Sequence, residues 1–198
     1  MIQRGDSIRV VHPLFQEEGS GSTPTSPLQL QVNECDTRRA AMLNQCWHSA
    51  LPNTYLANLL CGFHSVCFSA DFSGFSYAVA IWSDPVQQAL ANGSTIELRR
   101  LAIADDAPKF TASRMLAVMV RLIRVKFPDV RKAISYQAVG IHLGTIYKAS
   151  GWTQAAYVKF QPWNERKTRK RDGVFQHKHS QRQPAQIKTD KIRWEKLL

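Results

Sequence analysis

Residues 95–103 read TIELRRLAI, and the stretch that they open decides the fold. The β-branched and apolar residues in this run are typical of a strand, which the sequence DDAP at 105–108 then ends. Apolar residues recur at helical spacing from 115 to 127, and a short apolar run at 133–137 predicts a second strand. Because the helix lies between the two strands, we expect a parallel pair of strands joined by a right-handed crossover.

The ends of the predicted helices carry suitable capping residues. Thr111 or Ser113 can cap the first helix, and Pro128 stops it. A second helix is expected at 141–150, where Gly151 suits the position just past the helix end.

The remaining chain supplies further strands, one long helix and a tail. Asp36 or Thr37 can cap a helix that ends at Cys46 or His48. Strands are expected at 28–32, 63–70, 75–83 and 152–160, with a hairpin between the second and third and a short helix at 84–91. This order predicts an α/β (α+β) fold with a mixed central β-sheet flanked by helices.

Composition divides the chain into three parts. Residues 1–27, rich in Gly, Ser and Pro, predict a flexible N-terminal segment, and residues 28–160 predict the folded domain. Residues 161–198 form a basic C-terminal extension, with 11 Lys plus Arg against 4 Asp plus Glu. The net charge of +11 over 198 residues indicates a polyanionic partner, most simply nucleic acid.

Several protein classes are disfavoured. No apolar run approaches about 18 residues, which argues against a transmembrane helix, and residues 1–12 lack the apolar region of a signal peptide. Four cysteines without a disulfide framework are typical of reduced thiols in a cytoplasm.

The predicted order of elements is that of the GNAT acyltransferase fold. Residues 146–152 read IYKASGW, which resembles the signature "lYek-GF" near the end of that domain. The resemblance implies that Tyr147 lies beside the thioester sulfur of the donor and acts as a general acid. The acyl-donor loop of the family is rich in glycine, whereas the matching residues 106–114 contain none, which argues against a standard coenzyme A pocket.

A longer resemblance covers most of residues 35–198. Its blocks lie at 46–49, 77–82, 97–103, 107–116, 134–137 and 144–152, and together they resemble the phage Mom family. That family implies a GNAT-like enzyme, working in the host bacterial cytoplasm, that converts adenine in phage DNA to N6-carbamoylmethyladenine and so protects it from host restriction. The alternatives are an ordinary GNAT N-acetyltransferase that uses acetyl-CoA and a non-catalytic DNA-binding protein.

Four residues are candidates for catalysis. Glu97 lies where GNAT enzymes commonly place a general base, although pairing with Arg99 or Arg100 explains it equally well. Tyr136 ends a strand, where it either contacts the substrate or is a buried structural residue. Tyr147 is the third candidate. His48, together with His142, suits acid–base or metal chemistry, and the resemblance implies iron near His48.

The donor-binding candidates lie on the central strand and at the following helix start. They are Arg99, Ala102, Lys109, Ser113 and Arg114. Cations at a helix start call for an anionic ligand, although solvated surface charges are the alternative. The donor itself is open between an acetyl-CoA-like thioester and an aminoacyl-tRNA.

The C-terminal extension supplies the candidates for contact with double-stranded DNA. The basic residues expected to meet phosphates are Arg166, Lys167, Arg169, Lys170 and Arg171. Trp163 is the candidate for stacking on a flipped base or wedging into the base step. Trp194, also interleaved with basic residues, is expected to add an aromatic contact.

Overall fold

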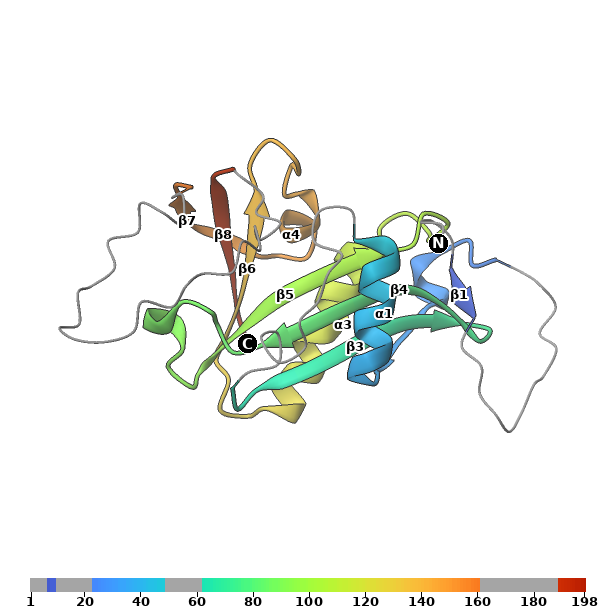
Figure 1. Cartoon of the computed structure of the whole chain (residues 1–198), viewed down its shortest axis with the longest axis horizontal. Coiled ribbons are helices and arrows are strands. Elements are labelled where there is room, and N and C mark those ends of the chain that lie inside the picture. Colours follow the sequence, from blue (N-terminus) through green and yellow to red (C-terminus); the bar gives the residue numbers. More distant parts are fainter. Residues whose placement is uncertain (1–6, 10–22, 49–61, 161–188) are drawn as a thin grey trace, which may run out of the picture.

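A computed structural model describes residues 7–9, 23–48, 62–160 and 189–198. Within these ranges the chain builds one eight-stranded sheet (Figure 1). Seven strands follow the order β2-β3-β4-β5-β6-β8-β7, and the eighth, β1, pairs with β4. The strands are β1 (Ile8–Arg9), β2 (Gln31–Glu34), β3 (Ser65–Phe72), β4 (Phe75–Ser83), β5 (Thr95–Ile103), β6 (Lys132–Ala138), β7 (Thr153–Val158) and β8 (Lys191–Leu197). The α-helices are α1 (Thr37–Trp47), α3 (Thr111–Lys126) and α4 (Thr145–Ala149), and the 3-10 helices are η1 (Pro27–Gln29) and η2 (Gln88–Leu90).

The sheet is mixed in the way that the sequence predicts. β5 and β6 pair in parallel, and α3 is the crossover between them. β3 and β4 form the expected hairpin, and every other neighbouring pair of described strands is antiparallel. The fold class is therefore confirmed.

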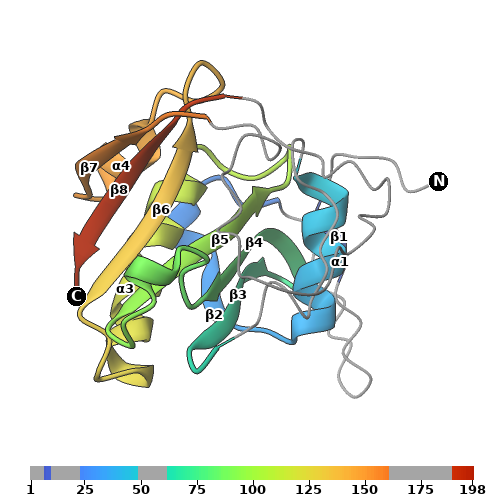
Figure 2. The same ribbon diagram turned by 60° about the vertical axis from the view of Figure 1, so that its left-hand side comes forward.

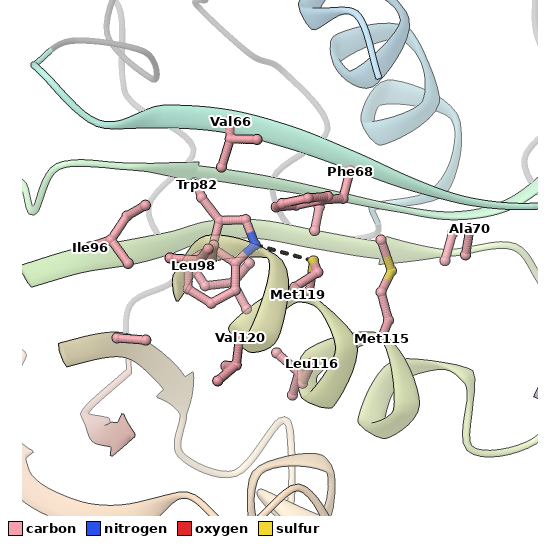
Figure 3. Close-up of a cluster of buried hydrophobic side chains, with 14 of the residues drawn as sticks. Val66, Phe68, Ala70, Trp82, Ile96, Leu98, Met115, Leu116, Met119 and Val120 are labelled. Carbon is pink, nitrogen blue, oxygen red and sulfur yellow. Dashed lines mark hydrogen bonds between the residues drawn. The ribbon is translucent and has the colours of Figure 1, made fainter. Parts of the chain in front are cut away.

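Helices cover the two faces of the sheet. α1 lies on one face, where Leu43 and Trp47 pack against the side chains of Val79 and Ile81. α3 lies on the opposite face, as the turned view shows (Figure 2). There the indole Nε1 of Trp82 donates to the Met119 sulfur at 3.2 Å, inside a cluster of apolar side chains from β3, β4, β5 and α3 (Figure 3). These two cores hold β5 rigidly at the centre of the molecule.

Several local predictions need correction. Helix α3 begins after Phe110, and the hydroxyls of Thr111 and Ser113 donate to the carbonyls of Pro108 and Phe110 instead of capping backbone N–H groups. Asp36 does cap α1, accepting from the N–H groups of two following residues. The predicted helix at 141–150 is reduced to α4, which Gly151 follows with a positive φ of 70°.

The domain boundaries also differ from the composition. Lys191–Leu197, assigned from the sequence to a basic extension, is β8 and lies between β6 and β7. The predicted strand at 28–32 is replaced by η1 and then β2, because Ser26 and Gln29 form a reciprocal capping box that starts a helical turn. Ile8–Arg9, placed in the flexible segment, pairs with β4.

No helix in the described ranges is long and apolar enough to cross a membrane. Three cysteines in those ranges, Cys35, Cys46 and Cys67, are free thiols.

Candidate active site

A cleft opens where β5 and β6 separate. The two strands pair only from Thr95 to Leu98 and from Lys132 to Ser135, and their carboxyl-terminal parts diverge. The resulting cleft has a volume of about 490 Å³ and is walled by β5, β6, the end of α1, the start of α3 and the segment from 141 to 147. Ligands bind at the carboxyl ends of parallel strands, so this is the expected position of a site.

A β-bulge shapes the cleft. Leu98 pairs with Trp82 and Arg100 pairs with Ile81, so Arg99 is an extra residue in β5. A bulge bends its strand and increases its twist, which helps to turn β5 away from β6. It also leaves Arg99 and Arg100 on successive positions that both line the cleft.

The cleft is positively charged. Arg99 and Arg100 line it, and no carboxylate side chain does so among the described residues. Burial, and then the charge of Arg99, lower the pKa of the Arg100 guanidinium. Glu97, which does not line the cleft, lies 3.5 Å from the Arg99 Nε and offsets part of this charge. The positive charge that remains in the lining favours an anionic ligand.

Tyr147, the residue that the sequence proposes as general acid, lines the cleft and is buried. Its ring stacks on Trp194 with centroids 5.3 Å apart and meets Trp152 edge-on at 5.7 Å. The hydroxyl is 2.8 Å from the Ser135 hydroxyl on β6. Burial raises the pKa of the Tyr147 phenol, and the Ser135 hydrogen bond lowers it by less. The phenol therefore holds its proton at neutral pH.

Sequence reasoning missed two partners of this tyrosine. Ser135 was available as the polar residue that alternates with apolar neighbours on β6. Trp194 was expected to contact nucleic acid, whereas only 3 % of it is exposed and its indole Nε1 donates to the Gln137 side chain at 2.8 Å. No local signal indicated that β8 returns to this position.

Tyr136 and Glu97 lie differently with respect to the cleft. Tyr136 lines the cleft, is half-buried, and its hydroxyl donates to the Gln87 side chain at 3.4 Å. Glu97 does not line it: its carboxylate accepts from the Val86 N–H at 3.1 Å and lies 3.5 Å from the Arg99 Nε. The predicted pairing of Glu97 with Arg99 is thus present.

His48 lies at the end of α1 and lines the cleft beside Trp47, while His142 lines it from the loop after β6. Two histidines alone do not make a metal site, and no group of three or more His, Cys, Asp or Glu suited to a metal ion occurs in the described ranges. These residues therefore do not support the iron that the resemblance implied.

The loop before α3 replaces glycine with a strained residue. Phe110 adopts the left-handed conformation, with φ 69° and ψ 7°, which non-glycine residues rarely adopt. Of the predicted donor-binding residues, Arg99 and Ala102 line the cleft. Lys109, Ser113 and Arg114 do not, although Ala112 between them does. The start of α3 thus reaches the cleft at Ala112 and not through these three side chains.

The predicted DNA-contacting residues lie outside the described ranges. These are Trp163, Arg166, Lys167, Arg169, Lys170 and Arg171.

Solved structures with the same arrangement are acetyltransferases. An acetyltransferase from Bacillus subtilis in complex with CoA superposes with a TM-score of 0.57 at 12 % identity, over 85 % of this chain and 99 % of that one. A GNAT family acetyltransferase from Elizabethkingia anophelis with acetyl-CoA bound superposes with a TM-score of 0.55 at 13 % identity, over 86 % of this chain and 99 % of that one. The ribosomal-protein-S18-alanine N-acetyltransferase from Escherichia coli superposes with a TM-score of 0.54 at 14 % identity, over 85 % of this chain and 93 % of that one. At such low identities the likeness establishes the fold, which is the GNAT fold.

The sequence matches one protein family. The model of the Mom protein family covers residues 29–197, which includes every described strand except β1 and also the whole cleft. No curated protein sequence matches the chain.

Proposed function

The chain belongs to the Mom protein family, and from this premise we propose that it is a group-transfer enzyme that modifies the exocyclic amine of adenine in DNA. The proposed product is N6-carbamoylmethyladenine, which the family resemblance implies, and its role is to protect phage DNA from restriction. The observation that carries the proposal is the cationic cleft between β5 and β6 with a protonated tyrosine in its lining.

The reaction requires three catalytic functions from the protein. The adenine amine is a weak nucleophile because its lone pair is delocalised into the ring, so a proton must leave N6 as it forms a bond to the methylene carbon of the donor. The charge that develops needs stabilisation, and the group that departs from that carbon needs a proton. An adenine in a duplex must also leave the base stack to enter a cleft.

Residues that line the cleft are candidates for these catalytic functions. His48 is the candidate base, since histidine titrates near neutrality. Tyr147, held by Ser135, is the candidate acid for the leaving group. Arg99 and Arg100 would bind the anionic donor or offset the developing negative charge. Tyr136, which is half-buried and lines the cleft, is the candidate for stacking on the flipped base.

The donor is proposed to have an anionic carrier, and it must supply the methylene carbon that is bonded to N6 in the product. An acetyl-CoA-like thioester is supported by the bound CoA and acetyl-CoA of two structural neighbours, and an aminoacyl-tRNA fits the same positive cleft. Double-stranded DNA is the proposed acceptor, bound in part by the basic residues between 161 and 188.

Mass spectrometry of nucleosides tests the proposal. Plasmid DNA recovered from bacteria that express the protein should contain an adenine nucleoside heavier by a carbamoylmethyl group. Tyr147→Phe should lower its yield about a hundredfold, the usual size of a general-acid contribution. The matched control is Tyr157→Phe, because Tyr157 lies on β7 at the molecular surface and its hydroxyl contacts Asp190 instead of the cleft.

The same experiment distinguishes the proposed DNA modification from a second candidate function. The fold neighbours with bound acetyl-CoA favour an N-acetyltransferase of the ordinary kind. Unmodified adenine in the presence of folded protein, together with tight binding of acetyl-CoA by calorimetry, would favour that enzyme and reject DNA as the substrate.

A further inference from the structure

The loop between β6 and α4 exposes large apolar side chains at the mouth of the cleft. In Leu143, 85 % of the residue is exposed, and in Ile141, 51 %. Both line the cleft that Tyr136 and Tyr147 also line. This segment is the loop that projects beyond the end of β6 at the top of the molecule in both views (Figures 1 and 2). An apolar tip in this position needs an explanation, because leaving large apolar side chains in water is unfavourable and such exposed groups often mark an interaction site.

The stem of this loop is fixed, although its tip is exposed. The Gln137 amide donates to the His142 carbonyl and accepts from the Trp194 indole, so the loop is bound to β6 and β8. The Val139 N–H donates to the Asp190 carbonyl at 2.9 Å, and Val139 accepts from the Thr189 hydroxyl at the same distance. The tip is thus held at a defined place beside the cleft.

Two glycines fit the turn at each end of the tip. Gly140 and Gly144 have φ of 81° and 70°, the region that favours glycine. At Gly144 a Cβ would lie 2.4 Å from the Gln137 Oε1 and 2.8 Å from the Trp194 Cζ2, so the chain returns closely packed against the sheet. Four successive residues, 140–143, are exposed between these fixed points.

We propose that Ile141 and Leu143 form a wedge that enters the base stack of duplex DNA and fills the space left by the adenine that moves into the cleft. This inference rests on the proposed function. Apolar side chains inserted between bases unstack them, and proteins that act on a single base must extrude it from the stack. Arg99 and Arg100 line the same cleft as Ile141 and Leu143, so the cleft offers positive charge to the phosphates that flank an extruded base.

The wedge carries out a task that the cleft alone does not. A flipped adenine leaves a gap that its partner base and neighbours tend to close, which returns the adenine to the stack. A rigid apolar tip that occupies the gap slows that return. Leu143 and Tyr136 line the same cleft, so a wedge at this tip adjoins the cleft that would receive the adenine.

The test uses the purified full chain and duplexes in which 2-aminopurine replaces adenine in every nearest-neighbour context. Extrusion of this analogue raises its fluorescence. The loop variant is Ile141→Ser with Leu143→Ser. The matched control is Leu28→Ser with Val125→Ser, because these side chains are 73 % and 84 % exposed and neither lines the cleft.

We expect the wild type and the control to raise the fluorescence equally. The loop variant should bind the duplexes within about threefold of the wild type but give a fluorescence rise about tenfold smaller, since a base-stack contact and not a phosphate contact is lost. The fluorescence rise with the loop variant should return to the wild-type level on duplexes whose 2-aminopurine faces an abasic site, because the base is already unpaired there.

Three outcomes would overturn the wedge. An equal fluorescence rise with the loop variant would show that Ile141 and Leu143 do not act in extrusion. An equal loss of affinity for duplex and single-stranded DNA would make the loop a general docking surface. A wild type that binds duplexes and modifies plasmid adenine without raising the fluorescence would reject the wedge alone, whereas a wild type that binds no DNA would reject the proposed function with it.

Discussion

At the scale of single residues, Glu97 illustrates how burial and pairing compete. Its carboxylate is buried on β5, accepts one backbone N–H from Val86 and contacts Arg99. Desolvation raises the pKa of Glu97, and the charge of Arg99, the second cause in size, lowers it without cancelling the rise. A carboxylate in this setting is held by its neighbours and does not face the cleft, so its role is proposed to be structural.

Replacing Glu97 by Gln tests that role through pH. Because the folded pKa is raised above the ordinary 4.5, ionisation of Glu97 opposes folding, and its contribution to the free energy of unfolding falls as the pH rises through the folded pKa. Glu97→Gln should therefore unfold in urea with a free energy close to that of the wild type at low pH and higher than that of the wild type at neutral pH. Adenine modification should stay within about twofold of wild type, as for residues outside a site. A large loss of modification in a stable variant would instead make Glu97 the general base.

At the scale of elements, β8 completes the site from the far end of the chain. Trp194 at its centre is buried, stacks on Tyr147 and donates to Gln137, so one strand supports both the acid candidate and the loop at the mouth of the cleft. We expect Trp194→Ala to lower the free energy of unfolding by about 3–5 kcal/mol, the usual range for a buried tryptophan. Leu197→Ala, on the same strand but 79 % exposed, should change it by less than about 0.5 kcal/mol. Urea unfolding of both variants decides this, and equal small effects would mean that β8 does not pair as described.

The elements that sequence predicted are those whose signals are local. The alternating run of β5, the apolar spacing of α3 and the hairpin of β3 and β4 each follow from neighbours in the chain, and each is confirmed. β8 was missed because its residues are basic and because its partner, β6, lies more than 50 residues away in sequence. The bulge at Arg99 was missed for the same reason, since a register shift belongs to a pair of strands and not to one.

The candidate site likewise has a part that local sequence signals predict and a part that depends on contacts between distant segments. The resemblance and the strand pattern placed Tyr136, Tyr147 and His48, and all three line the cleft. The shape of the cleft and the bond between Tyr147 and Ser135 depend on the divergence of β5 from β6, which no single segment encodes. The exposed apolar tip of Leu143 was read as part of a helix, because its exposure is a property of the folded chain.

At the scale of the whole molecule, the net charge of +11 is concentrated away from the core. Residues 161–198 hold a net +7, while several carboxylates of the described ranges pair with nearby cations such as Arg39, Lys126 and Arg193. Charge held this way supplies affinity for a polyanion and little selectivity, because phosphate contacts carry no sequence information. The cleft and its loop would then determine which base is modified.

The salt dependence of DNA binding tests this division. Neutralising Arg166, Arg169 and Arg171 together to Gln should reduce the slope of log K against log salt by up to about 3, since each lost phosphate contact removes roughly 0.9. The matched control neutralises Arg38, Arg121 and Arg124, three exposed arginines on α1 and α3 that do not line the cleft, and its slope should change by less than about 1. Fluorescence anisotropy with a labelled duplex at several salt concentrations measures both. Equal changes in the two variants would show that the molecule attracts DNA by its total charge, and an unchanged slope in the first would remove the C-terminal basic segment from the DNA interface.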